Sequence, residues 1–378
     1  MNLLIKKWKE FEVETRAGFG GKWMVEIVNP NGATQKPFGD KLRNNLITNS
    51  GIDLAIGRTV NAPNYKTTAP IAYTIPNIIR QAAYGNNPTP AQVTDTDLTV
   101  SRVLTSDPDG NTIGVGDTSS TQDCTVEYDT ATGFARFTRV YDFPIVTGDT
   151  FINDIGIYSQ NSSGARNLFS RMVMPFMITL TAGQFLRLTY VLQVNIPSLV
   201  TPIPVTVTSG GFNGGGQFKL VGSYQNIFGT MTNRGVPTYT LLDSAHARMG
   251  GWLMNGSVNT ANTNRTTAHM VPALIDFPTV NSALNFTQVG TTINSSSSGM
   301  VFGSYSVGQG YQDITYFFNA GNPTPTSNIG GIVFCSVTSA TEVLTNPKYG
   351  WYWKFNTTQQ KEESFSLSIN VRQSVVRL

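Results

Sequence analysis

The sequence predicts an all-β protein made of two β-sandwich or barrel-like domains with short helices only. Apolar and polar residues alternate at two-residue spacing in many short runs, which is typical of strands with one buried face. Gly-, Asn- and Pro-rich turn signals separate these runs. Charged residues are 13% of the 378-residue chain, about half of the ~25% in an ordinary soluble domain. We therefore expect a neutral polar surface, suited to contact with protein chains or sugars.

The first half contains the clearest local signals. Residues 22–28, KWMVEIV, alternate as a strand and end at the hairpin signal NPNG. Residues 49–57, NSGIDLAIG, predict a short helix with Ser50 as N-cap and Gly57 at its end. Residues 75–84, IPNIIRQAAY, fit a helix or a strand equally well. The runs CTVEYD and FARFTRVYDF predict a hairpin around residues 130–133.

The stretch 168–198 is apolar and long enough to span a bilayer, but its period is that of strands. Even positions from 186 to 196 are apolar, while Arg187, Thr189 and Asn195 alternate with them. A membrane helix would bury Arg187 at a cost of roughly 2.5 kcal/mol or more. Two strands are predicted here, with a turn at 181–183, and Pro175 is expected at an edge or a bulge. No membrane insertion is expected.

Changes in composition divide the chain into four parts. We expect an N-terminal arm over residues 1–19, a β module over 20–198, a Pro- and Gly-rich junction over 199–216 and a second β domain over 217–378. The strand candidates of the second half are residues 239–243, 252–255, 273–277, 313–319, 331–337, 349–355 and 364–378.

Nucleic-acid binding is not expected, because the net charge is only +3 and Lys6, Lys7 and Lys9 form the one basic cluster. Cys124 and Cys335 do not make a disulfide framework in a chain of this size. Residues 1–11 do not resemble a signal peptide. We expect synthesis and assembly in the cytoplasm of the producing cell.

Several segments, in order, resemble structural proteins of tailed-bacteriophage virions. Residues 44–56, NNLITNSGIDLAI, are similar to an "NLIT-x-x-G-L" segment of tail-fibre and related proteins, and residues 84–98 are similar to the "G-x-G-x-x-P-x-x-x-D-x-x-L" stretch that follows it. Residues 152–174 and 178–194 resemble the "EVGI…LFSR" and "I-x-L-x-x-G-E-x-L" pair. Here Asp154 and Gln184 stand where glutamate is expected.

The resemblance implies a non-enzymatic virion protein of the tail-fibre or tail-appendage type. The first domain would dock into the particle, and the second would project and contact a host-surface glycan or protein. The implied partners are other virion proteins and further copies of the chain, with a homotrimer as the expected oligomer. Two alternatives remain, namely a capsid decoration or head–tail joining protein and a glycan-cleaving appendage.

Three groups of residues could carry chemistry. Asp107, Asp109, Asn111 and Asp117 form a possible calcium loop, although DPDG is also an ordinary turn. A glycan-cleaving site needs two facing carboxylates, for which Asp276 and Asp313 are the candidates. His246 and His269 lack neighbouring ligands, so hydrogen-bonding roles are favoured over a metal site.

The aromatic run YGWYWKF, residues 349–355, predicts a strand with one core face. Tyr352 would then point outward beside Lys354, as a possible surface contact for a sugar or a neighbouring subunit. Core packing accounts for the other aromatic residues of the run. No cofactor is expected.

Overall fold

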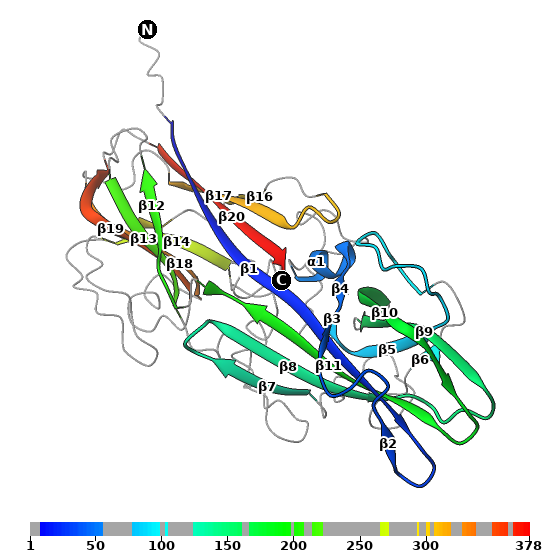
Figure 1. Ribbon diagram of the computed structural model, residues 1–378. Helices are drawn as coiled ribbons and strands as arrows, with labels where there is room; N and C mark the ends of the chain where they lie inside the picture. The colour runs from blue at the N-terminus through cyan, green and yellow to red at the C-terminus, as the bar shows by residue number, and fades with distance from the viewer. Residues whose placement is uncertain are drawn as a thin grey trace.

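A long strand, β1 (Trp8–Val28), organises the fold in the computed structural model of the chain. The structure describes residues 8–55, 78–98, 103–104, 124–160, 166–197, 200–207, 214–221, 265–271, 293–294, 300–302, 306–318, 327–337, 350–361 and 366–378. Strand β1 runs through the largest sheet, and the chain ends beside it (Figure 1).

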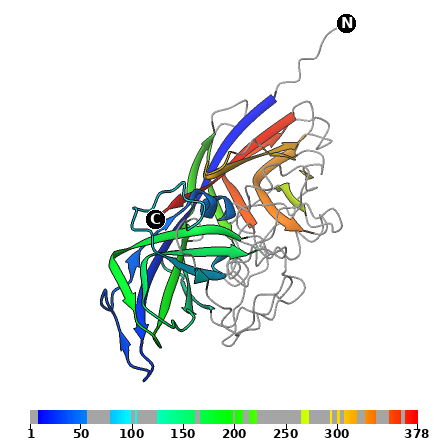
Figure 2. The same cartoon turned by 90° about the vertical axis from the view of Figure 1, so that its right-hand side faces the viewer.

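The largest sheet, sheet A, has nine strands. Its other members are β2 (Thr34–Gln35), β3 (Arg43–Asn44), β7 (Cys124–Asp129), β8 (Phe134–Asp142), β11 (Phe185–Asn195), β16 (Met300–Phe302), β17 (Tyr311–Phe318) and β20 (Ser366–Arg377). The order along the sheet is β16-β17-β20-β1-β11-β8-β7, with β2 and β3 also paired to β1. Strand β1 pairs antiparallel with β11 from Gly18 onward and parallel with β20 from Trp8 to Phe19, and Figure 2 shows β1 and β20 side by side.

Two smaller sheets complete the architecture. Sheet B has the order β4-β10-β9-β5-β6 and contains β4 (Leu46–Ile47), β5 (Gln81–Gly85), β6 (Val103–Leu104), β9 (Thr150–Gln160) and β10 (Arg166–Leu180). Sheet C has the order β12-β13-β19-β18-β14-β15 and contains β12 (Ile203–Val207), β13 (Gly214–Val221), β14 (Arg265–Val271), β15 (Ile293–Asn294), β18 (Ser327–Val337) and β19 (Gly350–Lys361). Within the described ranges the one helix is α1 (Asn49–Ala55). The prediction of an all-β fold is confirmed.

The apolar stretch of the sequence forms β10 and β11, as predicted. On β11 the even residues from Leu186 to Val194 are buried, and they share one core with Met172 and Met174 of β10. The turn between the strands carries the chain from sheet B to sheet A, with Gly183 at φ +87°. The register of β10 against β9 shifts between Val173 and Ile178, so Pro175 lies in a bulge.

The sheets do not follow the four-part division expected from composition. Strand β1 crosses the expected boundary at residues 19/20 without interruption, so the second half of the expected N-terminal arm is strand. Strands β16, β17 and β20, from the expected second domain, belong to sheet A together with β8 and β11. One buried cluster also joins Phe19, Leu188 and Trp353. Composition gave no hint of this because parallel pairing between distant segments has no local signal.

The helix prediction is confirmed, but its N-cap is not Ser50. The Thr48 hydroxyl accepts the Gly51 N–H at 3.0 Å, and the Thr48 carbonyl accepts the Ile52 N–H at 3.1 Å. Thr48 is therefore the N-cap, two residues earlier than expected. In the ambiguous stretch 75–84, Ile78 is helical and strand β5 begins at Gln81, while residues 75–77 lie outside the described residues.

The hairpin predicted around residues 130–133 is confirmed as β7 and β8. In the second half, β17 and β18 cover the candidates that begin at Asp313 and Gly331. Gly57 and the candidates at 239–243, 252–255 and 273–277 lie outside the described residues.

Candidate functional site

Most of the acidic and histidine candidates fall outside the described residues. Those residues are His246, Asp276 and the calcium candidates Asp107, Asp109, Asn111 and Asp117. His269 lies in strand β14, opposite Val333 of β18. In the part of the chain that the structure describes, no three His, Cys, Asp or Glu side chains come together as a metal site would require.

The prediction that Tyr352 points outward is wrong. Tyr352 is 1% exposed, its neighbour Trp353 is equally buried, and Lys354 is partly buried. Tyr352 and Trp353 point to opposite faces of the strand, so the burial of both means that β19, which lies between β13 and β18, is covered on both faces. An internal strand can be covered on both faces, and its apolar residues then need not alternate. Tyr352 is thus a core residue.

Asp313 is engaged in an ion pair across two strands. Its two carboxylate oxygens accept hydrogen bonds from Nε and Nη2 of Arg372 at 2.8 and 3.0 Å. The two residues are directly opposite in β17 and β20, and the guanidinium lies 4.4 Å from the ring centre of Tyr311. This bidentate geometry links two strands of sheet A, which is a structural role for the carboxylate.

The most distinctive polar cluster of the described residues is centred on Arg171 in β10. Its Nε donates to Asp154 Oδ2 at 3.0 Å, and its Nη1 donates to Asp95 Oδ2 at 2.8 Å. Its Nη2 donates to the carbonyls of Asn87 and Thr89 at 3.3 and 3.1 Å. We call Arg171, Asp154 and Asp95, with these two carbonyls, the loop clamp.

Burial makes the loop clamp energetically sensitive. The side chain of Asp154 is fully buried and that of Arg171 almost so, whereas Asp95 is one-fifth exposed. Burial raises the pKa of Asp154, against the opposing effects of the Asn87 N–H and the Arg171 guanidinium. Burial also acts to lower the pKa of Arg171, but hydrogen bonds to Asp95 and Asp154 outweigh it, and the pKa is raised.

The same loop, residues 86–98, is tied down at further points. The Asn87 N–H donates to Asp154 at 3.1 Å, and the Tyr158 hydroxyl donates to Asp97 at 2.5 Å. The Asn49 N–H at the start of α1 donates to the Val93 carbonyl at 2.7 Å. The loop is therefore fixed along its length to β9, β10 and the helix.

The clamp joins two of the segments on which the resemblance rests, because residues 84–98 supply the loop with Asp95, and residues 152–174 supply Asp154 and Arg171. A third segment, residues 44–56, contacts the same loop through the Asn49 N–H and the Val93 carbonyl. Both carboxylates bind the same guanidinium, so the arrangement positions a loop and does not face two acids across a cleft. Sequence reasoning missed Arg171, whose signal was a charged residue inside an otherwise apolar run.

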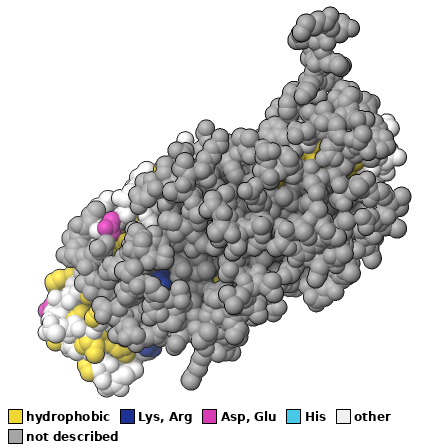
Figure 3. All heavy atoms as spheres, turned by 180° about the vertical axis from the view of Figure 1, so that it is seen from behind, with side chains coloured by type: hydrophobic (Ala, Val, Ile, Leu, Met, Phe, Trp, Pro, Cys, Tyr) yellow, Lys and Arg dark blue, Asp and Glu magenta, His cyan; other side chains and the backbone are white. Residues whose placement is uncertain are grey.

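Exposed apolar side chains gather at the end of the molecule where the β1–β2 hairpin projects. Phe151 of β9 and Phe176 and Met177 of the β10 bulge are 46%, 56% and 48% exposed. Figure 3 shows apolar side chains at this end of the molecule. We call these three residues the apolar rim.

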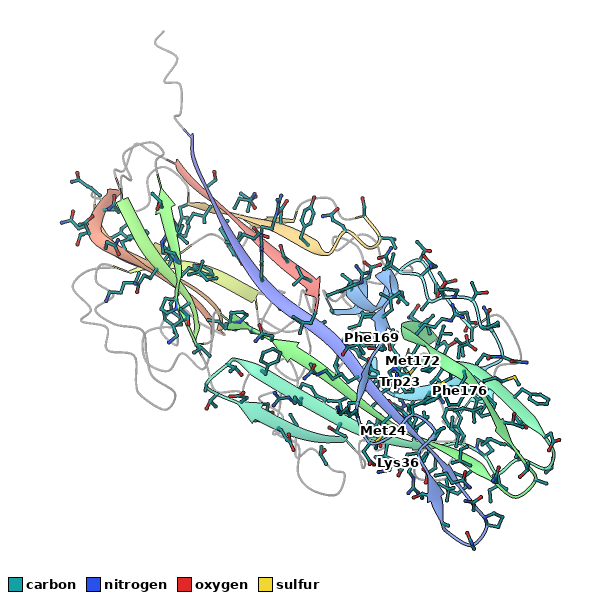
Figure 4. All side chains as sticks on the ribbon, in the orientation of Figure 1. Trp23, Met24, Lys36, Phe169, Met172 and Phe176 are labelled. Atoms are coloured by element: carbon teal, nitrogen blue, oxygen red, sulfur yellow. The ribbon has the colours of Figure 1, made fainter. Side chains whose placement is uncertain are left out.

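An aromatic contact chain connects the rim to the core. The ring of Phe176 lies 4.8 Å from that of Phe38, which lies 5.7 Å from that of Trp23 in edge geometry. The Arg43 guanidinium lies 5.5 Å from the ring centre of Phe38. In Figure 4 Trp23 lies near Phe169 and Met172, and Phe176 lies further along β10. The rim is thus backed by packed side chains.

Comparison with known proteins gives no match to a family model, a curated protein or a solved structure. No helix within the described ranges is long and apolar enough to cross a membrane.

Proposed function

We propose that the chain is a non-enzymatic structural subunit of a tailed-phage virion, of the tail-fibre or tail-appendage type. The observation that carries this proposal is the loop clamp. Two of the segments that resemble virion proteins, residues 84–98 and 152–174, are joined by it, and in the described residues its charges bind one another and the loop carbonyls.

The surface of this unit supports a role in assembly. Large apolar side chains are usually scattered singly over monomeric proteins, and grouped ones mark contact sites. Phe151 lies opposite Thr179 in the β9–β10 ladder, so Phe151 and Met177 belong to one end of sheet B. An end with aromatic and Met side chains, backed by Phe38, suits a protein–protein contact. We propose that the apolar rim contacts a neighbouring virion subunit in a homo-oligomer, with three copies expected from the resemblance.

Binding to separated virion parts tests the proposal. The purified chain would be incubated with isolated tails and isolated heads of the phage that encodes it, and co-sedimentation would be measured. We expect binding to tails, and we expect Met177→Asp to weaken the self-association of the free chain at least tenfold. Val307→Asp is the matched control, because Val307 is equally apolar and 57% exposed in a different loop. Light scattering of the free chain would report its number of copies.

Two outcomes would contradict this function. Binding to heads and not to tails would favour a decoration or head–tail joining protein. Binding to neither, with release of sugars from host envelope polysaccharide, would favour the glycan-cleaving alternative. For that alternative, the pairing of Asp313 with Arg372 gives no support, since the carboxylate is engaged within the sheet.

A further inference from the structure

Strand β10 carries three methionines that differ sharply in their exposure. Met172 and Met174 are 2% and 5% exposed and belong to the main buried cluster, whereas Met177 is 48% exposed. Met24 of β1, the other methionine whose side chain the structure describes, is partly buried. Among these residues, Met177 is therefore the one whose thioether solvent reaches most readily.

The bulge in β10 places Met177 at the surface. The β9–β10 ladder is interrupted between Val173 and Ile178, so residues 174–177 have no register partner in β9. Residues 175–177 are all exposed, which regular two-residue alternation does not produce. The interruption thus exposes Phe176 and Met177 together, and Figure 4 shows Phe176 further along β10 than the buried Met172.

We propose that Met177 is a redox-sensitive modification site, where oxidation of the thioether by hydrogen peroxide weakens contact through the apolar rim. One peroxide oxygen is transferred to the sulfur as the O–O bond breaks, and the products are methionine sulfoxide and water. The sulfur is oxidised by two electrons and the peroxide is reduced by the same two. Because peroxide must reach the sulfur, the thioethers of Met172 and Met174 are protected by their burial in the core.

The oxidised side chain no longer suits an apolar contact. Oxidation turns a flexible apolar side chain into a polar one, and burying a polar group without a hydrogen bond is unfavourable. Phe151 and Phe176, the other members of the rim, have no side-chain donor for the sulfoxide oxygen. Contact through the rim should therefore weaken on oxidation. This consequence rests on the proposed role of the rim, whereas the oxidation itself does not.

Peptide mapping by mass spectrometry tests the modification site on the full chain. The folded chain would be treated with dilute hydrogen peroxide, quenched and digested, and fragment ions would give the rate of sulfoxide formation at each methionine. We expect Met177 to oxidise at least tenfold faster than Met172 and Met174. Unfolding in urea before the treatment should abolish this difference, because the three thioethers are then equally accessible.

Two variants connect the oxidation with the rim. Sedimentation at increasing concentrations would give the self-association constant of each chain before and after peroxide treatment. We expect oxidation to weaken self-association at least tenfold in the unsubstituted chain and in the control Met24→Leu. Oxidation of Met177→Leu should leave its constant equal to its own untreated value. Both methionine sulfoxide reductases with a thiol reductant should restore association, because they return the thioether and release water and a disulfide.

Retention on a hydrophobic-interaction column needs no neighbouring copy and so separates this inference from the proposed function. The singly oxidised chain should elute earlier than the untreated chain. Equal oxidation rates at Met177 and Met174, or weaker association after oxidation of Met177→Leu, would overturn the inference. A chain that is monomeric before oxidation contradicts the proposed homo-oligomer. Earlier elution would then still support Met177 as the modification site, and unchanged retention would overturn it.

Discussion

Replacing Arg171 by Met should lower the free energy of unfolding far more than replacing an exposed arginine. The substitution keeps most of the aliphatic volume and removes the guanidinium. It leaves the fully buried Asp154 without its cation and the carbonyls of Asn87 and Thr89 without their donor. Removing one partner of a buried ion pair costs about 3–5 kcal/mol. We therefore expect the free energy of unfolding to fall by about that amount.

Arg187 offers a matched control on the next strand. It forms a bidentate pair with Asp142 at 2.6 and 2.7 Å, but the side chains of Arg187 and Asp142 are 36% and 49% exposed. Exposed ion pairs contribute about 0–1 kcal/mol. Urea unfolding followed by tryptophan fluorescence would give both values for Arg171→Met and Arg187→Met under one condition.

One result of these measurements would contradict the prediction for Arg171. A loss for Arg171→Met that is no larger than that for Arg187→Met would show that burial does not amplify the clamp. A second variant, Arg171→Met with Asp154→Leu, should recover part of the loss, because it removes the uncompensated charge as well. If the double variant is as unstable as the single one, the guanidinium–carbonyl contacts carry the effect.

Three further predictions can be checked by the same urea unfolding. Thr48→Ala should lower the free energy of unfolding by about 1–2 kcal/mol because it removes the N-cap of α1, whereas Ser50→Ala should change it by less than about 0.5 kcal/mol. Gly183→Ala should cost about 1–2 kcal/mol because its φ is +87°, and Gly148→Ala, where a Cβ meets nothing within 4 Å, should be nearly neutral. Burial raises the pKa of Tyr190 to about 12, so the folded chain keeps a proton that the unfolded chain releases above its ordinary pKa of about 10. Stability should then fall by about 1.4 kcal/mol per pH unit from pH 10 to 12, and Tyr190→Phe should lack this slope; an equal slope in the variant would contradict the assignment.

Local patterns were sufficient wherever a strand has one buried and one exposed face. The alternation over residues 186–194 predicted both the existence of β11 and its inward side. Pro175 marked the bulge because proline cannot donate to a ladder. The short helix was also visible, but several adjacent Ser, Thr and Asn residues can each cap a helix, so the pattern did not distinguish Thr48 from Ser50.

The sequence patterns did not predict the pairing of distant strands or the burial of a strand on both faces. No periodicity says that Trp8 lies beside Ser366, so a strand was divided into an arm and a domain. The alternation rule predicted that Tyr352 is exposed, because the rule assumes that one face of a strand contacts solvent. Strand β19 is covered on both faces. Arg171 was hidden because its partners come from other segments, and only the fold brings them within hydrogen-bonding distance.

The loop clamp gives a reason for the burial of charged side chains in a chain that has few of them. A stretch like residues 86–98, with little regular structure, would ordinarily have to be ordered when a partner arrives, and such ordering weakens binding. Here Arg171 and Tyr158 fix the stretch during folding through its carbonyls and through Asp95 and Asp97. The conformational entropy of the loop is then lost during folding and not during association. In the proposed assembly, the buried charges would hold the loop in place before a neighbouring subunit binds.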